Sequence, residues 1–278
     1  MKNIKLIILF LAILSGAVAQ AKDLSILFIG NSYIYLPSQG TPEDPALPKI
    51  IGQVIQSIDS KLNLKYAYNT PGGYTYEKHL NDPKTQNLLQ NSYDSVILQG
   101  QSIESLELPP EWHKFGIGVQ NFSVNLPKVI DLALVKNSNV TVFVNWGWNF
   151  KNSNLQPGAE GLLFPPGSAK AGQRWCGADK FELQQMIDAS YQKHATGKKV
   201  TLSMVGNTWL TLQKKGLVGE DDLYLKDDWS HPSVLGSYVE ALVLTRDALK
   251  LDISKATFVP AGVDQKLAKS IRELLTKK

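Results

Sequence analysis

Apolar residues along the chain fall into two patterns, short continuous runs and longer runs with helical spacing. The short runs have the length of buried strands and cover residues 23–29, 64–68, 95–99, 140–145 and 199–205. Between and after them, spacings of three and four predict helices over residues 47–58, 74–89 with a break at Pro83, 126–135, 179–194, 233–249 and 263–275. Strands that alternate with helices predict an α/β fold, a flavodoxin-like three-layer α/β/α arrangement around a five-stranded parallel sheet.

The first strand is followed directly by Gly30-Asn31-Ser32. Open α/β sheets bind ligands outside the carboxyl ends of their strands, so Ser32 is expected to face a crevice, where a nucleophile is useful. Gly-Asn-Ser is also ordinary turn chemistry, and a catalytic role therefore needs partners elsewhere. Residues 33–46 contain Pro37, Gly40, Pro42 and Pro45, and this composition predicts a loop over the site.

Two further turns leave the sheet at the same predicted edge. The second strand is followed by a turn-rich loop with Gly72 and Gly73, where a backbone can approach a ligand closely. The third strand ends in Gln99-Gly100-Gln101-Ser102. The sequence thus predicts a polar cluster around Ser32.

A second informative segment is Asp228-Trp229-Ser230-His231-Pro232, near the carboxyl end. An aspartate three residues before a histidine can fold back to bond the imidazole, which fixes its tautomer and stabilises the cation formed during proton transfer. Pro232 suits the first turn of the helix that follows. If this segment stood alone, the simpler interpretation of an Asp-x-x-His pair would be a helix cap beside a surface histidine.

The four segments together resemble the SGNH hydrolase superfamily, the GDSL-type serine esterases, and they occur in that family's order. The resemblance implies the SGNH hydrolase fold and a serine esterase in which Ser32 is the nucleophile, His231 the general base and acid, and Asp228 its orienting partner. It also implies an oxyanion hole made by the backbone N–H groups of Ser32 and Gly73 and a side-chain amide of the third segment.

The chain departs from the family pattern in two places. The usual Gly-Asp-Ser is Gly-Asn-Ser, which keeps the nucleophile. The usual Gly-x-Asn-Asp is absent, and Gln99-Gly100-Gln101-Ser102 is similar to the Gln-Gly-Glu-Ser turn of related carbohydrate acetylesterases. That comparison favours Gln99 as the oxyanion donor, whereas counting from the strand end favours Gln101. We choose Gln101 because it lies further beyond the sheet edge.

Composition and the amino terminus bear on location. The 278 residues are 43% hydrophobic and 19% charged, which suits one globular domain over residues 20–278. Residues 1–19 have a basic start, an apolar run too short to span a bilayer and an A-x-A frame, the pattern of a secretory signal peptide, with cleavage after residue 21 as the alternative. We expect a secreted or periplasmic protein with no stable membrane insertion after cleavage. The formal charge of +4 is dispersed, so no nucleic-acid partner is expected.

The remaining polar and aromatic residues add expectations about substrate and cofactors. Residues 149–177 are rich in glycine and proline and predict a long loop insertion. Trp229, Trp146, Trp148 and His79 are candidates to line the cleft, with ordinary core or surface roles as the alternative. No histidine or carboxylate pair has zinc-ligand spacing, so neither a metal nor another cofactor is expected.

The preferred hypothesis is therefore a secreted hydrolase that removes a small acyl group, acetyl above all, from a carbohydrate, with a small-molecule or polysaccharide ester as its partner. A lipid or aryl ester is the alternative within the same class of enzyme. The competing hypothesis is a non-catalytic secreted carbohydrate-binding protein on the same fold, because a fold does not determine a function.

Overall fold

A five-stranded parallel sheet organises the computed structural model, which describes residues 22–102, 104–106, 121–149, 162–163, 174–176, 179–228 and 230–277. The strands are β1 (Lys22–Ile29), β2 (Leu62–Asn69), β3 (Ser95–Gln99), β4 (Val140–Val144) and β7 (Thr201–Met204). Their order is β2-β1-β3-β4-β7, and every neighbouring pair is parallel. The predicted flavodoxin-like sheet is confirmed. A separate antiparallel pair joins β5 (Leu162–Leu163) to β6 (Arg174–Cys176).

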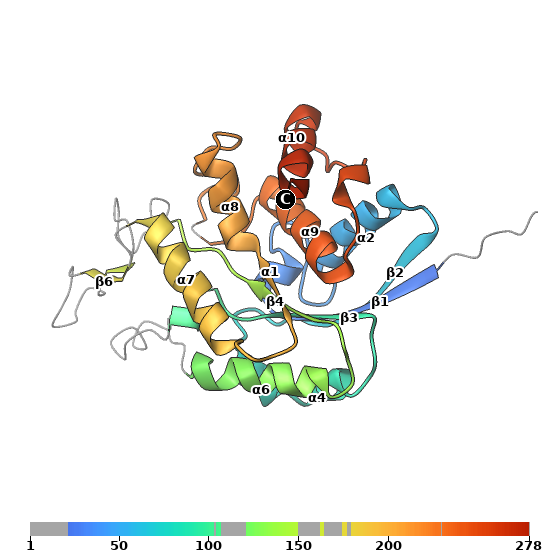
Figure 1. Ribbon diagram of the computed structural model, residues 1–278, viewed down its shortest axis with the longest axis vertical. Coiled ribbons are helices and arrows are strands. Elements are labelled where there is room, and N and C mark those ends of the chain that lie inside the picture. Colours follow the sequence, from blue (N-terminus) through green and yellow to red (C-terminus); the bar gives the residue numbers. More distant parts are fainter. Residues whose placement is uncertain are drawn as a thin grey trace, which may run out of the picture.

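Helices cover both faces of this sheet (Figure 1). One face packs against α2 (Ala46–Ile58), α8 (Val205–Lys214) and α9 (Val234–Leu249), and α10 (Gln265–Thr276) lies outside α9. The other face packs against α6 (Phe122–Leu134) and α7 (Lys180–His194), together with α3 (Tyr76–Leu80) and α4 (Pro83–Leu89). The structure also has two 3₁₀ turns among its described residues, η1 (Glu104–Leu106) and η3 (Ile253–Lys255).

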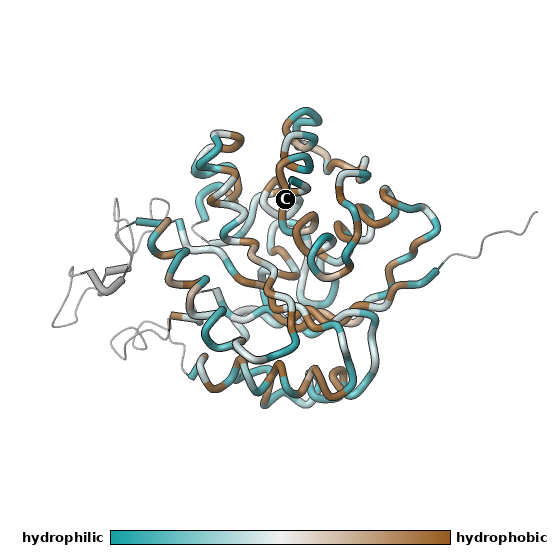
Figure 2. The backbone as a smooth tube through the Cα atoms, viewed as in Figure 1, coloured by the Kyte–Doolittle hydropathy of each residue, from teal (hydrophilic) through white to brown (hydrophobic). Residues whose placement is uncertain are grey.

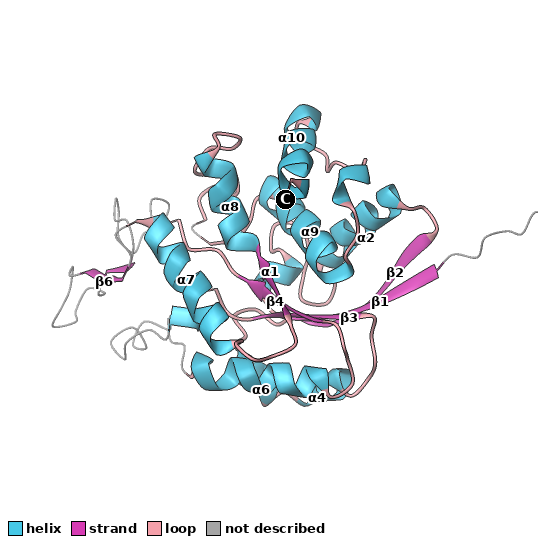
Figure 3. Cartoon of the chain, in the orientation of Figure 1, coloured by secondary structure: helices cyan, strands magenta, loops and turns pink. Residues whose placement is uncertain are grey.

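The core lies in two layers, one on each side of the sheet. Figure 2 shows the hydrophobic stretches of the tube meeting along the strands, and Figure 3 shows the strands as one layer between helices. All five residues of β3 and all five of β4 are buried, which explains why both segments are continuous apolar runs. Alternate residues of these central strands therefore face different helical layers.

The helix boundaries follow side-chain caps that the sequence contains. Asp179 accepts from the amides of Phe181 and Glu182 at the start of α7, and Ser233 accepts from the amide of Gly236 at the start of α9. Asp82 caps α4 with Pro83 in the first turn, so the predicted helix over 74–89 is divided there into α3 and α4. Each of these helices therefore begins one residue after a capping side chain.

Two elements differ from the expectations. The loop predicted over residues 33–46 begins with a short helix, α1 (Ser32–Tyr35), and the fifth strand ends at Met204 because α8 begins at Val205. The signal peptide predicted over residues 1–19 and most of the loop insertion predicted over 149–177 lie outside the described residues. Among the residues that are described, no helix has the length and apolar character needed to cross a membrane.

Candidate active site

The turn after β1 places Ser32 at the carboxyl edge of the sheet. Gly30 is required there, because a Cβ atom would come 2.6 Å from Ile34 Cγ1 and 2.7 Å from Gln99 Oε1. Asn31 is the cap of α1: its side-chain oxygen accepts from the Tyr33 amide at 3.1 Å, and its side-chain nitrogen donates to the Tyr74 carbonyl at 2.9 Å. Ser32, the first residue of α1, is held by this turn and is partly exposed.

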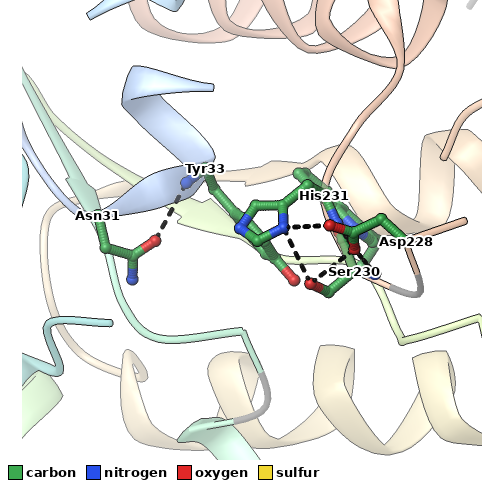
Figure 4. A network of polar contacts seen from close by, with 6 residues as sticks. Asn31, Tyr33, Asp228, Ser230 and His231 are labelled. Atoms are coloured by element: carbon green, nitrogen blue, oxygen red, sulfur yellow. Dashed lines mark hydrogen bonds and ion pairs between the residues drawn. The ribbon is translucent and has the colours of Figure 1, made fainter. Parts of the chain in front are cut away.

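The loop before α9 brings the predicted aspartate and histidine together. The Nδ1 atom of His231 lies 2.7 Å from Asp228 Oδ2, and Figure 4 shows the imidazole between Tyr33 and Asp228. The other carboxylate oxygen accepts from the backbone amides of Ser230 at 2.7 Å and His231 at 2.9 Å. The carboxylate is thus bonded on both oxygens, and it fixes the loop as well as the ring.

These contacts also set the charge of the aspartate. Burial by itself would raise the pKa of Asp228, but the amides of His231 and Ser230 and the imidazole bond to the charged form and hold the pKa below its usual range. Asp227, just before it, has φ 61°, the left-handed region in which aspartate is enriched among non-glycine residues. An ionised carboxylate beside Nδ1 favours the tautomer in which Nδ1 carries the proton and Nε2 accepts.

A cavity of about 340 Å³ joins the sites predicted from the sequence. The structure brings Ser32, Gly73, Gln101 and His231 together in its lining, and Asp228 lies behind His231. Gly73 has φ 66°, a left-handed conformation that glycine adopts without steric cost. The wall also includes residues for which the sequence predicted only membership of the same turns and loops: Asn31, Tyr33, Tyr35, Gly72, Ser102 and Ser230.

The turn after β3 separates the two glutamines. Gln99 is fully buried, its Oε1 accepts from the Asn31 amide at 2.9 Å, and its Nε2 contacts Gly100 O and Asn145 Oδ1. Gln101 is partly exposed and lines the cavity, with its Nε2 2.7 Å from Ser102 Oγ. Gln99 therefore supports the turn that carries Ser32, whereas the Gln101 side chain lies where a ligand would bind.

Two buried polar side chains hold this turn from behind, and neither was predicted. Asn145, after β4, donates to the carbonyls of Gly100 at 3.0 Å and Ser102 at 3.2 Å. Glu104 accepts from the amide of Gln101 at 2.9 Å and from that of Tyr76 at 3.0 Å. Burial raises the pKa of Glu104 to about 8, although the two amides oppose the rise. The position of Asn145 at a strand end was the available signal, whereas Glu104 in isolation has the pattern of a surface residue.

The expectation that Trp146 and Trp148 line the cleft is wrong. Each is only 1% exposed, so neither ring offers a face to a substrate. Trp146 stacks with Tyr33 at 4.3 Å and with Trp209 at 4.2 Å between ring centroids, and its Nε1 donates to the Ser230 carbonyl at 2.8 Å. Large rings at the end of a central strand bury more apolar area in the core than at the surface. Through this hydrogen bond to Ser230, Trp146 supports the loop that carries His231.

The expectation that His79 lines the cleft is also wrong, because its side chain is fully buried and does not line the cavity. Burial lowers the pKa of His79 to about 4, so the ring is neutral at ordinary pH. Trp229, the remaining candidate for substrate contact, lies outside the described residues. Within the part of the chain that the structure describes, no group of three or more His, Cys, Asp or Glu residues has an arrangement that could hold a metal ion.

Comparison with known proteins gives matches among solved structures alone. No family model matches the chain, and no curated protein matches it. A proposed SGNH hydrolase from Slackia heliotrinireducens superposes with a TM-score of 0.53 at 19% identity, over 81% of this chain and 99% of that one. A DUF4886 family protein from Bacteroides uniformis gives 0.58 at 13% identity, over 92% and 96%. A variant of an acetyl xylan esterase from Geobacillus stearothermophilus gives 0.54 at 10% identity, over 87% and 100%.

These similarities extend over nearly the whole length of each neighbour. At 10–19% sequence identity, these similarities are evidence about the fold alone. The resemblance noted in the sequence is confirmed at that level, and the chain has the α/β/α fold of the SGNH hydrolases.

Proposed function

We propose that this protein is a secreted serine esterase that removes a small acyl group, acetyl above all, from a carbohydrate. One observation carries the proposal: His231, paired with Asp228 at 2.7 Å, lines the same cavity as Ser32, although about 200 residues separate them in the chain. A nucleophile, a base and a group that orients the base are the parts that acyl transfer requires.

In the proposed reaction, Ser32 Oγ attacks the ester carbonyl while His231 Nε2 takes its proton. Nε2 has this role because Nδ1 is engaged by Asp228. The new Ser32 Oγ–carbonyl bond forms, the bond to the alcohol breaks, and His231 returns the proton to the departing alcohol oxygen. Water then attacks the acyl-enzyme with His231 again as base, which releases the carboxylic acid and restores Ser32.

Negative charge develops on the carbonyl oxygen in both steps, and donors must be in place to stabilise it. We assign this role to the backbone amides of Ser32 and Gly73 and to the side-chain amide of Gln101. All three residues line the cavity. Gln99 is the less suitable donor, because its side chain is fully buried and already supports Asn31.

The size and lining of the cavity support a small acyl group on a polar alcohol. Its volume of about 340 Å³ is modest, and Tyr35, Gln101, Ser102 and Ser230 add polar groups to the wall. A similarly folded neighbour is described as an acetyl xylan esterase, which is consistent with a carbohydrate acetyl ester. A lipid or aryl ester is the alternative substrate class, and a comparison of short and long acyl chains separates the classes.

The test is hydrolysis of 4-nitrophenyl acetate, butyrate and octanoate, with acetylated xylo-oligosaccharides in parallel, by the wild type and by Ser32→Ala, Asp228→Asn and His231→Ala. We expect acetyl preference, release of acetate from the oligosaccharides, and losses of several orders of magnitude in each variant. A fluorophosphonate should label Ser32 in the wild type alone. Turnover that survives Ser32→Ala would refute the serine mechanism, and octanoate preference would refute the substrate class. Sugar binding without hydrolysis would favour the non-catalytic hypothesis.

A further inference from the structure

The proposed mechanism gives no role to His79, although this histidine is fully buried and contacts the turn that carries the nucleophile. We infer that His79 is a neutral positioning residue, which holds the peptide unit before the nucleophile through a hydrogen-bonded relay from Asn69 and Thr85. This inference rests on the proposed role of Ser32.

The peptide unit between Gly30 and Asn31 is bonded at both of its polar groups. Its carbonyl oxygen lies 2.9 Å from His79 Nε2, and its N–H donates to Gln99 Oε1 at 2.9 Å. In a trans peptide these two groups point in opposite directions, so the two side chains hold the peptide plane from opposite sides. Gly30 has no room for a side chain, so the turn around this peptide is closely packed.

The partners determine which ring nitrogen of His79 carries the proton. A carbonyl oxygen accepts only, so Nε2 must be protonated to bond Gly30 O. The ring is neutral, since burial lowers the pKa of His79 to about 4, and Nδ1 is then an acceptor. Thr85 Oγ1, 3.0 Å away, must donate to it.

The hydroxyl of Thr85 is directed in turn by Asn69. The side-chain nitrogen of Asn69 donates to Thr85 Oγ1 at 2.8 Å and to Asp82 Oδ2 at 2.6 Å. Because the hydroxyl accepts from Asn69, its own proton is available for His79. The donors therefore run in one direction, from Asn69 through Thr85 and His79 to the Gly30 carbonyl.

The relay connects the end of β2 and the α3–α4 segment to the nucleophile turn. Asn69 is the last residue of β2, and its carbonyl also accepts from the Gly30 amide at 3.1 Å. Gly30 is thus bonded on its amide by the Asn69 backbone and on its carbonyl by His79. Since Ser32 follows two residues later, rotation of this peptide would displace its hydroxyl, and a misplacement of about 1 Å can cost on the order of a hundredfold in rate.

The first experiment compares His79→Leu with His79→Gln, using 4-nitrophenyl acetate. Leucine fills the space without a donor, whereas the glutamine amide can donate to Gly30 O. We expect His79→Leu to lower kcat roughly tenfold to a hundredfold with KM nearly unchanged, and His79→Gln to restore most of the loss. His194→Leu is the matched control, because His194 contacts Phe122 on the α6–α7 side and has no part in the relay. Equal kcat values for His79→Leu and the wild type would overturn the inference.

The second experiment tests the relay by a double-mutant cycle. Thr85→Val removes the hydroxyl that directs the ring and leaves the residue's shape. Thr85→Val should lower kcat in the wild type and have little further effect in His79→Gln, because the glutamine does not need a directed tautomer. Additive losses in the double variant would mean that Thr85 acts on the site independently of His79, and would refute the relay.

Two measurements decide the inference without using activity. Nitrogen-15 NMR of the His79 ring at pH 7 should show Nε2 protonated and Nδ1 bare in the wild type. Amide hydrogen exchange at Asn31 should be at least about tenfold faster in His79→Leu than in His79→Gln. The opposite tautomer, or equal exchange rates, would refute the positioning role. A wild type that hydrolyses no ester would refute the proposed function alone, and these two measurements would still decide whether His79 holds the turn.

Discussion

Glu104 gives the strongest prediction about pH. Its carboxyl is fully buried behind the turn after β3, where it accepts from the amides of Gln101 and Tyr76. Burial favours the protonated form and raises the pKa of Glu104 from 4.5 to about 8. The folded protein therefore keeps this proton to a higher pH than the unfolded chain does. The resulting contribution to stability is fully present below pH 4.5 and is lost as the pH rises toward 8.

The magnitude follows from the size of the change in pKa. The pKa of Glu104 rises from 4.5 to about 8. At roughly 1.36 kcal/mol for each unit of pKa, this rise corresponds to a total of about 5 kcal/mol in the free energy of unfolding. Of this total, about 4 kcal/mol is lost between pH 5 and pH 9, the range over which the wild type and a variant can both be unfolded. That loss is a large part of the roughly 5–15 kcal/mol that stabilises a typical domain.

The assay is denaturant unfolding of the wild type and Glu104→Gln between pH 5 and pH 9. Glutamine keeps the size of the side chain and an acceptor oxygen but cannot ionise. We expect the free energy of unfolding of the wild type to fall steeply with pH and that of Glu104→Gln to fall by several kcal/mol less. Glu273→Gln is the matched control, because Glu273 lies on the exposed face of α10, 3.7 Å from Lys269, and it should leave the pH dependence unchanged. Parallel pH curves for the wild type and Glu104→Gln would refute the reasoning.

Four shorter predictions concern the oxyanion hole, the His231 loop, the core and the amino terminus. Gln101→Ala should lower kcat roughly a hundredfold with little change in KM or thermal stability, whereas Gln99→Ala should lower thermal stability. A kcat loss of the same size that is confined to Gln99→Ala would assign the oxyanion role to Gln99 instead. Trp146→Phe leaves the buried Ser230 carbonyl without its donor and should cost on the order of 2 kcal/mol in the free energy of unfolding, which urea titration would measure; an unchanged midpoint would contradict it. Glu240→Gln should stabilise the protein most at alkaline pH, because burial raises the pKa of Glu240 and neither of its carboxyl oxygens has a hydrogen-bond partner among the described residues. A thermal melt series from pH 5 to 9 would show the effect, and its absence would argue that Glu240 ionises normally. Amino-terminal sequencing of exported protein should find residue 20 or 22 first, and an intact Met1 in the membrane fraction would overturn the signal-peptide prediction.

The sequence was sufficient to predict the architecture, because strand burial leaves a local trace. Strands covered on both faces must be apolar throughout, so β3 and β4 are visible as continuous runs, and helices such as α2 show a buried stripe with helical spacing. Parallel strands end at one edge, and for that reason the order of strands and turns alone assigned Ser32, Gly73 and Gln101 to a single cluster. The pairing of Asp228 with His231 could likewise be predicted from the sequence, because both residues lie in one short loop.

Only the tertiary structure decided which polar and aromatic side chains face the cavity. The burial of Trp146, the buried position of His79 and the separate positions of Gln99 and Gln101 depend on side chains supplied by segments far away in the chain. A histidine on a short helix has the same local pattern whether it is solvated or bonded to a carbonyl 49 residues earlier. Local periodicity records the face on which a residue lies, whereas its hydrogen-bond partners are determined by packing between elements, and packing is a property of the folded chain.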